Sequence, residues 1–191
     1  YYYIGADIAT GRAQDYSAFS IMDRFGEEVA CFKGKMSVDK FTDTLIEMGY
    51  LYNNATIAPE ANDIGLAVVT KLQNCNYPNI YYTVQLVKKK KQKNPDQKNV
   101  PGWITTSYNR PIIIDELEED LRNDNAIIKD PFFIQEAYTF IYDSKNKPVA
   151  LGKERRSTEE DDSYSDDSIM AKAITNHIRK GKQKSLIIAP K

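Results

Sequence analysis

The chain has 191 residues, of which 41% are apolar and 11% aromatic; this composition fits a folded domain with its own core and excludes a disordered chain. The formal net charge is -1, so any binding of nucleic acid has to come from local patches of basic residues. The two cysteines have neither metal-binding spacing nor a disulfide framework, which fits a reducing compartment, and no apolar run approaches the ~18–20 residues of a membrane span.

The first third of the chain predicts three strands followed by a helix. Strands are expected at 1–8 and 17–22, and a third at 29–33 after the turn-forming segment "DRFGEE". Apolar side chains at three- and four-residue spacing then predict an amphipathic helix that begins after Ser37 and ends near Gly49.

The middle of the chain continues the alternation of strands and helices. A strand is expected at 55–60, a helix at 64–72 and a fifth strand at 79–87. This order predicts a mixed α/β sheet with helices as cover. The following segment 88–102, "KKKKQKNPDQKNVPG", is typical of a basic loop or hairpin tip.

The last part of the chain predicts two helices and a strand pair. Ser107 or Asn109 can cap a helix with one apolar stripe, and strands are expected at 137–143 and 148–151 around a turn. The final helix is expected at 168–181, after a long polar and acidic stretch.

Acidic residues stand at the ends of three different elements. Asp7 closes the first strand, Glu60 closes the fourth, and Asp166 and Asp167 precede the last helix. Carboxylates that meet in a crevice at a sheet edge repel one another, so they either raise their pKa values or hold a hard cation. Ligands that are all oxygen favour Mg²⁺ or Mn²⁺, and two such ions about 3.5–4 Å apart support phosphodiester hydrolysis.

Each of these acids also has an ordinary structural interpretation. Asp7 and Glu60 can be solvated residues at turns, and Asp166 or Asp167 can cap the last helix. The pattern of acids alone leaves both interpretations open.

Four segments form an ordered set of motifs over residues 4–178. They are "GADIATGRAQDYSAFSIMD", "IAPEANDIG", "PGWITTSYNRPIIIDELEEDL" and "SDDSIMAKAI". In this order they resemble the nuclease domain of large terminase subunits, the DNA-packaging motors of tailed phages. The resemblance implies a ribonuclease H-like fold and metal-dependent endonucleolytic cleavage of double-stranded DNA at the start and end of genome packaging.

The resemblance also implies roles for individual residues. Asp7, Glu60 and Asp167 correspond to the catalytic, metal-binding acids, with Asp166 beside Asp167 as a further ligand, and the implied cofactor is a pair of Mg²⁺ or Mn²⁺ ions. Asp15 is expected next to the ligands rather than among them, and a turn residue before the second strand is its alternative interpretation.

This chain departs from the family pattern at its last motif and in its extent. Ser165 stands where the family has histidine, and the single histidine, His177, is expected to be a packing or surface residue. No phosphate-binding Gly-x-x-x-x-Gly-Lys-Ser/Thr loop is present. Residues 1–191 are therefore expected to be one nuclease domain cut from a longer chain, without the N-terminal ATPase domain.

The partners implied by the resemblance are those of a packaging motor. They are double-stranded DNA and, in the full-length protein, the ATPase domain, the portal and the small terminase subunit. No membrane is implied, and the expected location is the host cell cytoplasm, transiently on the procapsid.

Candidate contacts to DNA are the basic residues of three segments. They are Arg12, Lys88, Lys89, Lys90, Lys91, Lys153, Arg155 and Arg156. The lysine run has two other interpretations, a solvated hairpin tip that resists edge pairing and, by the resemblance, a hairpin that gates access of DNA. Trp103 is expected to pack in the core rather than to stack on a base.

Two other functions fit the same acids. One is another ribonuclease H-like nuclease, such as a junction resolvase or a transposase-like enzyme. The other is a DNA-binding or assembly module without catalysis, in which the acids are structural.

Overall fold

The computed structural model describes residues 1–10, 16–87, 96–142, 148–150 and 165–181. Its strands are β1 (Tyr2–Asp7), β2 (Ser17–Asp23), β3 (Glu28–Gly34), β4 (Thr56–Pro59), β5 (Tyr82–Val87), β6 (Asp96–Pro101), β7 (Phe140–Tyr142) and β8 (Pro148–Ala150). Its helices are α1 (Val38–Leu51), α2 (Gly65–Asn74), α3 (Asn109–Arg122), α4 (Pro131–Tyr138) and α5 (Asp167–Arg179).

The main sheet has four strands in the order β3-β2-β1-β4. Strand β1 pairs antiparallel with β2 and parallel with β4, so the sheet is mixed, as the sequence predicts. Strands β5 and β6 form a separate antiparallel ribbon, and β7 and β8 form another. The strand expected at 79–87 is therefore present in part as β5, which pairs with β6. Just before β5, Ile80 forms an isolated parallel bridge with Ile57 of β4, so the start of the expected strand lies beside the main sheet.

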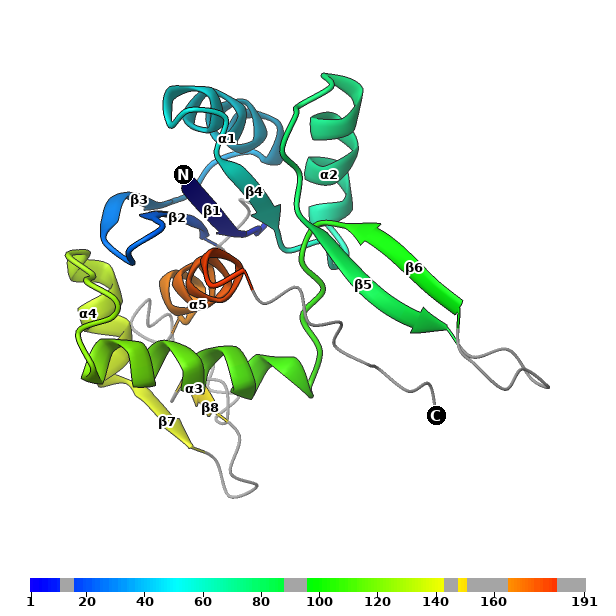
Figure 1. The fold of residues 1–191 in the computed structure, drawn as a ribbon. Helices are drawn as coiled ribbons and strands as arrows, with labels where there is room; N and C mark the ends of the chain where they lie inside the picture. The colour runs from blue at the N-terminus through cyan, green and yellow to red at the C-terminus, as the bar shows by residue number, and fades with distance from the viewer. Residues whose placement is uncertain (11–15, 88–95, 143–147, 151–164, 182–191) are drawn as a thin grey trace, which may run out of the picture.

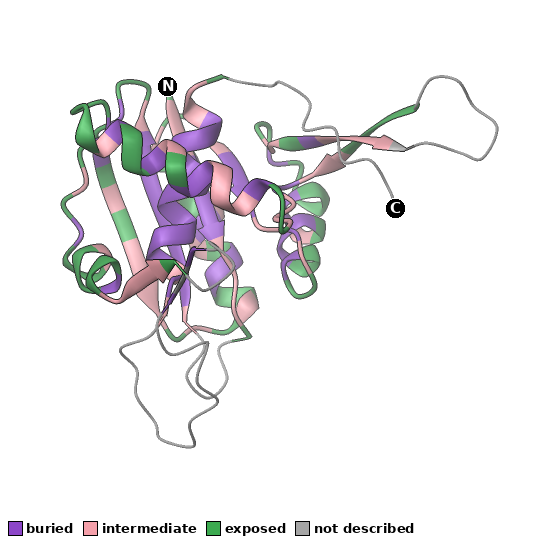
Figure 2. Ribbon diagram, turned by 90° about the horizontal axis from the view of Figure 1, so that it is seen from below, coloured by how far each residue is buried: buried purple, intermediate pink, exposed green. Residues whose placement is uncertain are grey.

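Helices cover both faces of the main sheet (Figure 1). On one face α1 and α2 enclose an apolar cluster that includes Ile4, Phe41 and Leu72. On the other face α5 lies against β1 and β2, and α3 packs on α5 around Ile113 and Ile174. Figure 2 shows the buried residues concentrated in the sheet and in α5.

The two-residue period of β1 separates the two faces of the sheet. Ile4 and Ala6 are fully buried in the cluster under α1 and α2. Because side chains alternate along a strand, Gly5 and Asp7 face α5 instead. The period thus directs the first acid of the sequence toward the last helix of the chain.

Two local expectations need correction. Helix α4 has no counterpart among the predicted elements, and the N-cap of α3 is Tyr108 rather than Ser107 or Asn109. The side chain of Asn109 instead accepts the N–H of Thr106 and donates to the carbonyl of Ile104.

None of the helices in the described ranges is long and apolar enough to cross a membrane.

Gly5 lets α5 approach the sheet closely. A Cβ at this position would lie 2.6 Å from the carbonyl oxygen of Ala171 and 2.6 Å from Oγ1 of Thr175. The Gly5 N–H donates to that same Oγ1 at 2.9 Å. A side chain here would therefore push α5 away from β1.

Replacement of Gly5 by alanine is expected to lower the free energy of unfolding by about 2–3 kcal/mol, because the new methyl group meets helix backbone that cannot rotate away. Urea unfolding measures the change. Gly181→Ala is the matched control: its Cβ meets no atom within 4 Å, so only the left-handed φ opposes it, at about 1 kcal/mol. Equal losses in the two variants would contradict the close approach of α5.

Candidate active site

Asp7 and Glu60 lie side by side where two parallel strands end. Ala6 of β1 is opposite Pro59 of β4, and the Glu60 N–H donates to the Ala6 carbonyl at 2.8 Å. Both acids directly follow these paired residues, so they occupy the same edge of the sheet. The buried Ala58 packs in the cluster under α5, and the two-residue period therefore directs Glu60 toward α5 as well.

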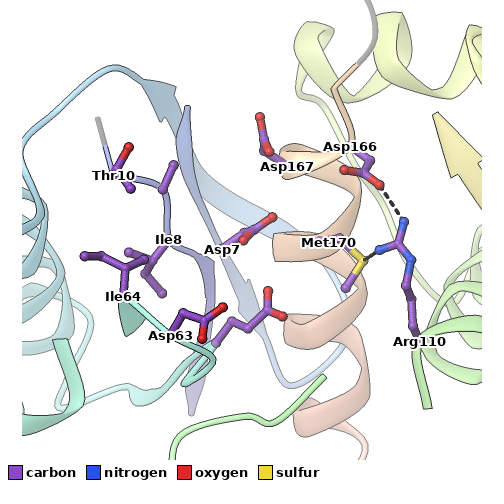
Figure 3. A pocket seen from close by; sticks show the side chains of 11 residues that line it. Asp7, Ile8, Thr10, Asp63, Ile64, Arg110, Asp166, Asp167 and Met170 are labelled. Atoms are coloured by element: carbon purple, nitrogen blue, oxygen red, sulfur yellow. Dashed lines mark hydrogen bonds and ion pairs between the residues drawn. The ribbon is translucent and has the colours of Figure 1, made fainter. Parts of the chain in front are cut away.

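The start of α5 brings the other two acids to the same edge. Asp166 is the residue before the helix, and Asp167 is its first residue. Together with Asp7 and Glu60 they line one cavity of about 440 Å³. Figure 3 shows this arrangement, with Asp7 on β1 directed toward α5. The four acids predicted from three elements thus lie around a common space.

The crowding of carboxylates changes the chemistry of Asp7. Burial of its side chain is the main cause that raises its pKa well above the usual value, and the negative charges of Glu60, Asp167 and Asp166 add to the effect. A hydrogen bond with Glu60 favours the protonated form further. Asp7 therefore ionises reluctantly unless a positive charge enters the cavity.

Two basic side chains offset part of the negative charge. Arg110 at the start of α3 forms an ion pair with Asp166, from Nη2 to Oδ2 at 2.5 Å (Figure 3). Lys33 of β3 lies with its Nζ 3.8 Å from Oδ2 of Asp167. Asp166 and Asp167 thus each have a different basic side chain beside them.

The alternative interpretation of Asp166 as a helix cap is wrong. Asp166 occupies the N-cap position of α5, but its side chain makes no capping hydrogen bond. Its carboxylate is only 3% exposed and faces Arg110 instead. The Asp166 carboxylate is therefore held by Arg110 at the edge of the cavity rather than used to cap the helix.

Sequence reasoning did not assign three residues that contribute to this site. Asn62 donates from Nδ2 to Oε1 of Glu60 at 3.0 Å and to the Thr105 carbonyl at 3.1 Å, so it fixes the orientation of that carboxylate. Asp63 lines the cavity as a further acid, with a positive φ of 43°. Arg110 is the third. All three fall inside the motifs that carry the family resemblance, and that position was the signal available for finding them.

The donor set suits a hard divalent cation. The side chains of Asp7, Glu60 and Asp167 offer only oxygen atoms, which Mg²⁺ and Mn²⁺ prefer. In the described part of the chain, no three Asp, Glu, His or Cys side chains already stand in a ligand arrangement. The chemistry of the residues fits such an ion, although the acids do not form a closed cage by themselves.

Other predicted site residues lie outside this cavity or outside the described residues. Trp103 is 1% exposed and donates from Nε1 to Oγ1 of Thr105, so it packs as predicted. His177 contacts Glu116 through Nδ1 at 2.7 Å and meets Trp103 edge-on, which is also packing. The residues that fall outside the described ranges are Arg12, Asp15, Lys88, Lys89, Lys90, Lys91, Lys153, Arg155 and Arg156.

The raised pKa of Asp7 predicts a dependence of stability on pH. Below about pH 3.9 the Asp7 carboxyl is protonated in both the folded and the unfolded chain. Between that pH and the raised pKa of the folded chain, the unfolded chain is ionised while the folded chain keeps the proton, so stability falls as the pH rises. In EDTA at pH 8, Asp7→Asn is expected to melt about 2–4 °C above the unsubstituted protein, and the gap should close toward pH 4.

Thermal melts between pH 4 and pH 8 measure this gap. Glu47→Gln, at an exposed position on α1, is the control for the loss of one negative charge. A gap that is the same at both pH values would contradict the raised pKa of Asp7.

The chain is similar in fold to several solved structures. No protein-family model and no curated protein sequence matches it. The large terminase nuclease domain of Thermus phage P74-26 has a TM-score of 0.66 at 20% identity, over 95% of this chain and 81% of that one. The large terminase nuclease of the thermophilic phage G20c has a TM-score of 0.59 at 17% identity, over 92% of this chain and 81% of that one. A structure of the latter nuclease with bound magnesium has a TM-score of 0.57 at 19% identity, over 92% and 80%.

At these identities the likeness shows the fold. It agrees with the mixed sheet, the helices on both faces and the position of α5 described above. The fold expected from the sequence is thereby confirmed: the chain has the ribonuclease H-like fold of large terminase nuclease domains.

Proposed function

We propose that this domain is a metal-dependent endonuclease that cleaves double-stranded DNA concatemers during phage genome packaging. The observation that carries the proposal is the cavity in which carboxylates from β1, the end of β4 and the start of α5 meet. The shared fold with large terminase nuclease domains supports it, and the magnesium bound to the nuclease of phage G20c supports the use of a divalent cation.

Asp7, Glu60 and Asp167 would hold the cations, two Mg²⁺ or Mn²⁺ ions by our proposal. When bound, such a pair makes water a stronger nucleophile and stabilises the leaving oxygen of a phosphodiester. Asp7 would be close enough to share ions with both, since the negative charges of Glu60 and Asp167 both raise its pKa. No nucleophile from the protein is needed for this chemistry.

We assign the direct contact at α5 to Asp167 rather than to Asp166. The Asp167 side chain is 21% exposed, whereas that of Asp166 is 3% exposed and paired with Arg110. Loss of the Asp166 carboxylate would leave the guanidinium of the partly buried Arg110 without this partner. Asp166 and Arg110 would therefore keep the edge of the cavity in place while Asp167 binds.

The setting of the reaction is part of the proposal. We place the domain in a large terminase subunit, next to an ATPase domain and in contact with the portal and the small subunit, in the host cytoplasm. Positioning on DNA would depend on these partners and on the basic segments predicted from the sequence. Weak sequence preference is expected of the domain alone, because contacts to phosphates carry no sequence information.

Cleavage of supercoiled plasmid tests the proposed activity. With Mg²⁺ or Mn²⁺ the protein is expected to nick and linearise the plasmid, and with EDTA it should not. Asp7→Asn is expected to lower the rate about 100-fold or more, because a direct ligand of the ions is lost. Asp43→Asn on α1, which covers the opposite face of the sheet, is the control and should cut normally.

Three outcomes would contradict the proposal. Equal cutting by the unsubstituted protein and by Asp7→Asn would show that the activity does not depend on this cavity. Retention of DNA without cleavage, also with the ATPase domain restored, would indicate a binding module. Preference for four-way junctions over linear duplex would indicate a resolvase of the same fold.

The two adjacent acids are expected to differ in the same assay. Asp167→Asn should lower the cleavage rate about 100-fold, like the loss of Asp7, because it removes a ligand. Asp166→Asn should lower it only about 10-fold, because it loosens Arg110 without removing a ligand. Rates over a series of Mn²⁺ concentrations measure both effects, and a larger loss in Asp166→Asn would reverse the assignment.

A further inference from the structure

Helix α5 begins with a shortage of hydrogen-bond acceptors. The first N–H groups of any helix have no partner within the helix, and the residue before it often supplies one. Here that residue is Asp166, whose carboxylate faces Arg110 and does not cap the helix. Another acceptor has to satisfy these groups, since Ser168 and Ile169 are buried.

Glu136 supplies the missing acceptors from a different helix. It lies on α4, and its carboxylate accepts the N–H of Ser168 at 3.2 Å through Oε1 and that of Ile169 at 3.0 Å through Oε2. The side chain is 4% exposed. A carboxylate at this place is also favoured by the partial positive charge at the N-terminus of a helix.

Lys33 neutralises this buried carboxylate and extends the contact toward the cavity. Its Nζ lies 2.6 Å from Oε1 of Glu136 and also bonds with Oγ of Ser165, which donates to Glu136 at 3.2 Å. The same Nζ is 3.8 Å from Oδ2 of Asp167. One ammonium group thus connects the cap of α5 to the acid that we assign as a ligand.

The register of the sheet puts Lys33 on the face that α5 covers. Asp7 on β1 is opposite Ala18 on β2, and Ala18 is opposite Lys33 on β3. Residues that pair across strands point to the same face, so Lys33 and Asp7 both face α5. The start of α5 therefore lies over the sheet with Lys33 of β3 on one side and Asp7 of β1 on the other.

We infer that Glu136, with Lys33, is a positioning residue that fixes the first turn of α5 and thereby the place of Asp166 and Asp167 at the cavity. This inference rests on the proposed function, because it concerns the ligands of the proposed ions. Glu136 touches neither the cavity nor a substrate. It acts through the backbone of the two residues that follow Asp167.

The rest of α5 is held by other contacts, so the role of Glu136 is local. Lys172 in the middle of the helix pairs with Asp130 at 2.6 Å, and Asn176 nearer its end donates to Asp120 at 2.8 Å. These contacts do not involve the first turn. Loss of Glu136 is thus expected to loosen the start of α5 while the helix stays on the sheet.

Variants at Glu136 and Asp120 separate positioning from general stability. In Glu136→Ala, hydrogen exchange of the Ser168 and Ile169 amides is expected to rise about tenfold or more, because they lose their acceptors. The dissociation constant for Mn²⁺, from calorimetric titration, is expected to rise about 10- to 100-fold, as for other residues that orient metal ligands. Glu136→Gln keeps one acceptor oxygen and should fall between.

Asp120→Asn is the control, because it weakens the hold on the other end of α5. It should lower the melting temperature without changing either readout at the first turn. A Glu136→Ala variant that melts earlier but binds Mn²⁺ as tightly as the unsubstituted protein would overturn the positioning role. If the unsubstituted protein itself binds no Mn²⁺, the proposed function fails, and with it the role of Glu136 toward the ions. Hydrogen exchange of the Ser168 and Ile169 amides would then still show whether Glu136 caps α5.

Discussion

The burial of a polar helix is the constraint on which the rest of this structure depends. Helix α5 lies between the sheet and α3, and Lys172, Thr175 and Asn176 on it are all at most 1% exposed. A buried charge or amide without partners costs several kcal/mol, so each of these groups needs a specific acceptor. The helix can therefore rest on the sheet in only one position, the one in which Lys172 meets Asp130 and Glu28.

That single position determines where the acids at the start of α5 lie. A shift of the helix by one residue moves it about 1.5 Å along its axis and turns its side chains by roughly 100°. Such a shift would separate Lys172 from its two carboxylates and Asn176 from Asp120. The polar core thus fixes Asp167 relative to Asp7 more firmly than apolar packing alone would, since apolar contacts tolerate small displacements.

The sequence predicts most of the fold because its main elements have clear periods. The apolar run in β1 and the spacing of apolar residues in α1 are local signals, and the four acids stand out because they lie at the ends of such elements. The pairing of β5 was beyond local reasoning, since a strand pattern does not identify its partner. Helix α4 is short, and three of its apolar residues, Phe132, Ile134 and Tyr138, are exposed, so it has no buried stripe to detect.

The candidate site was predictable to the same extent. Acids at element ends can be found from the sequence, but local periodicity does not show which residues pair with them. Lys33 and Glu136 are 103 residues apart, and Arg110 and Asp166 are 56 apart. No periodicity links such pairs. Ser165 illustrates the same limit. In the sequence it departs from the family motif, whereas in the structure its hydroxyl bonds with both Lys33 and Glu136.

The charge of the cavity sets an order on binding. Among the described residues that line it, five are acids (Asp7, Glu60, Asp63, Asp166 and Asp167) and one, Arg110, is basic and already paired. A DNA phosphate carries negative charge and would be repelled by this surface at close range, where screening by salt is weak. If DNA is the substrate, as we propose, cations would have to enter the cavity before a phosphate could approach. By this argument, the acids that raise the pKa of Asp7 are also those that would make bound cations a condition for contact with the proposed substrate.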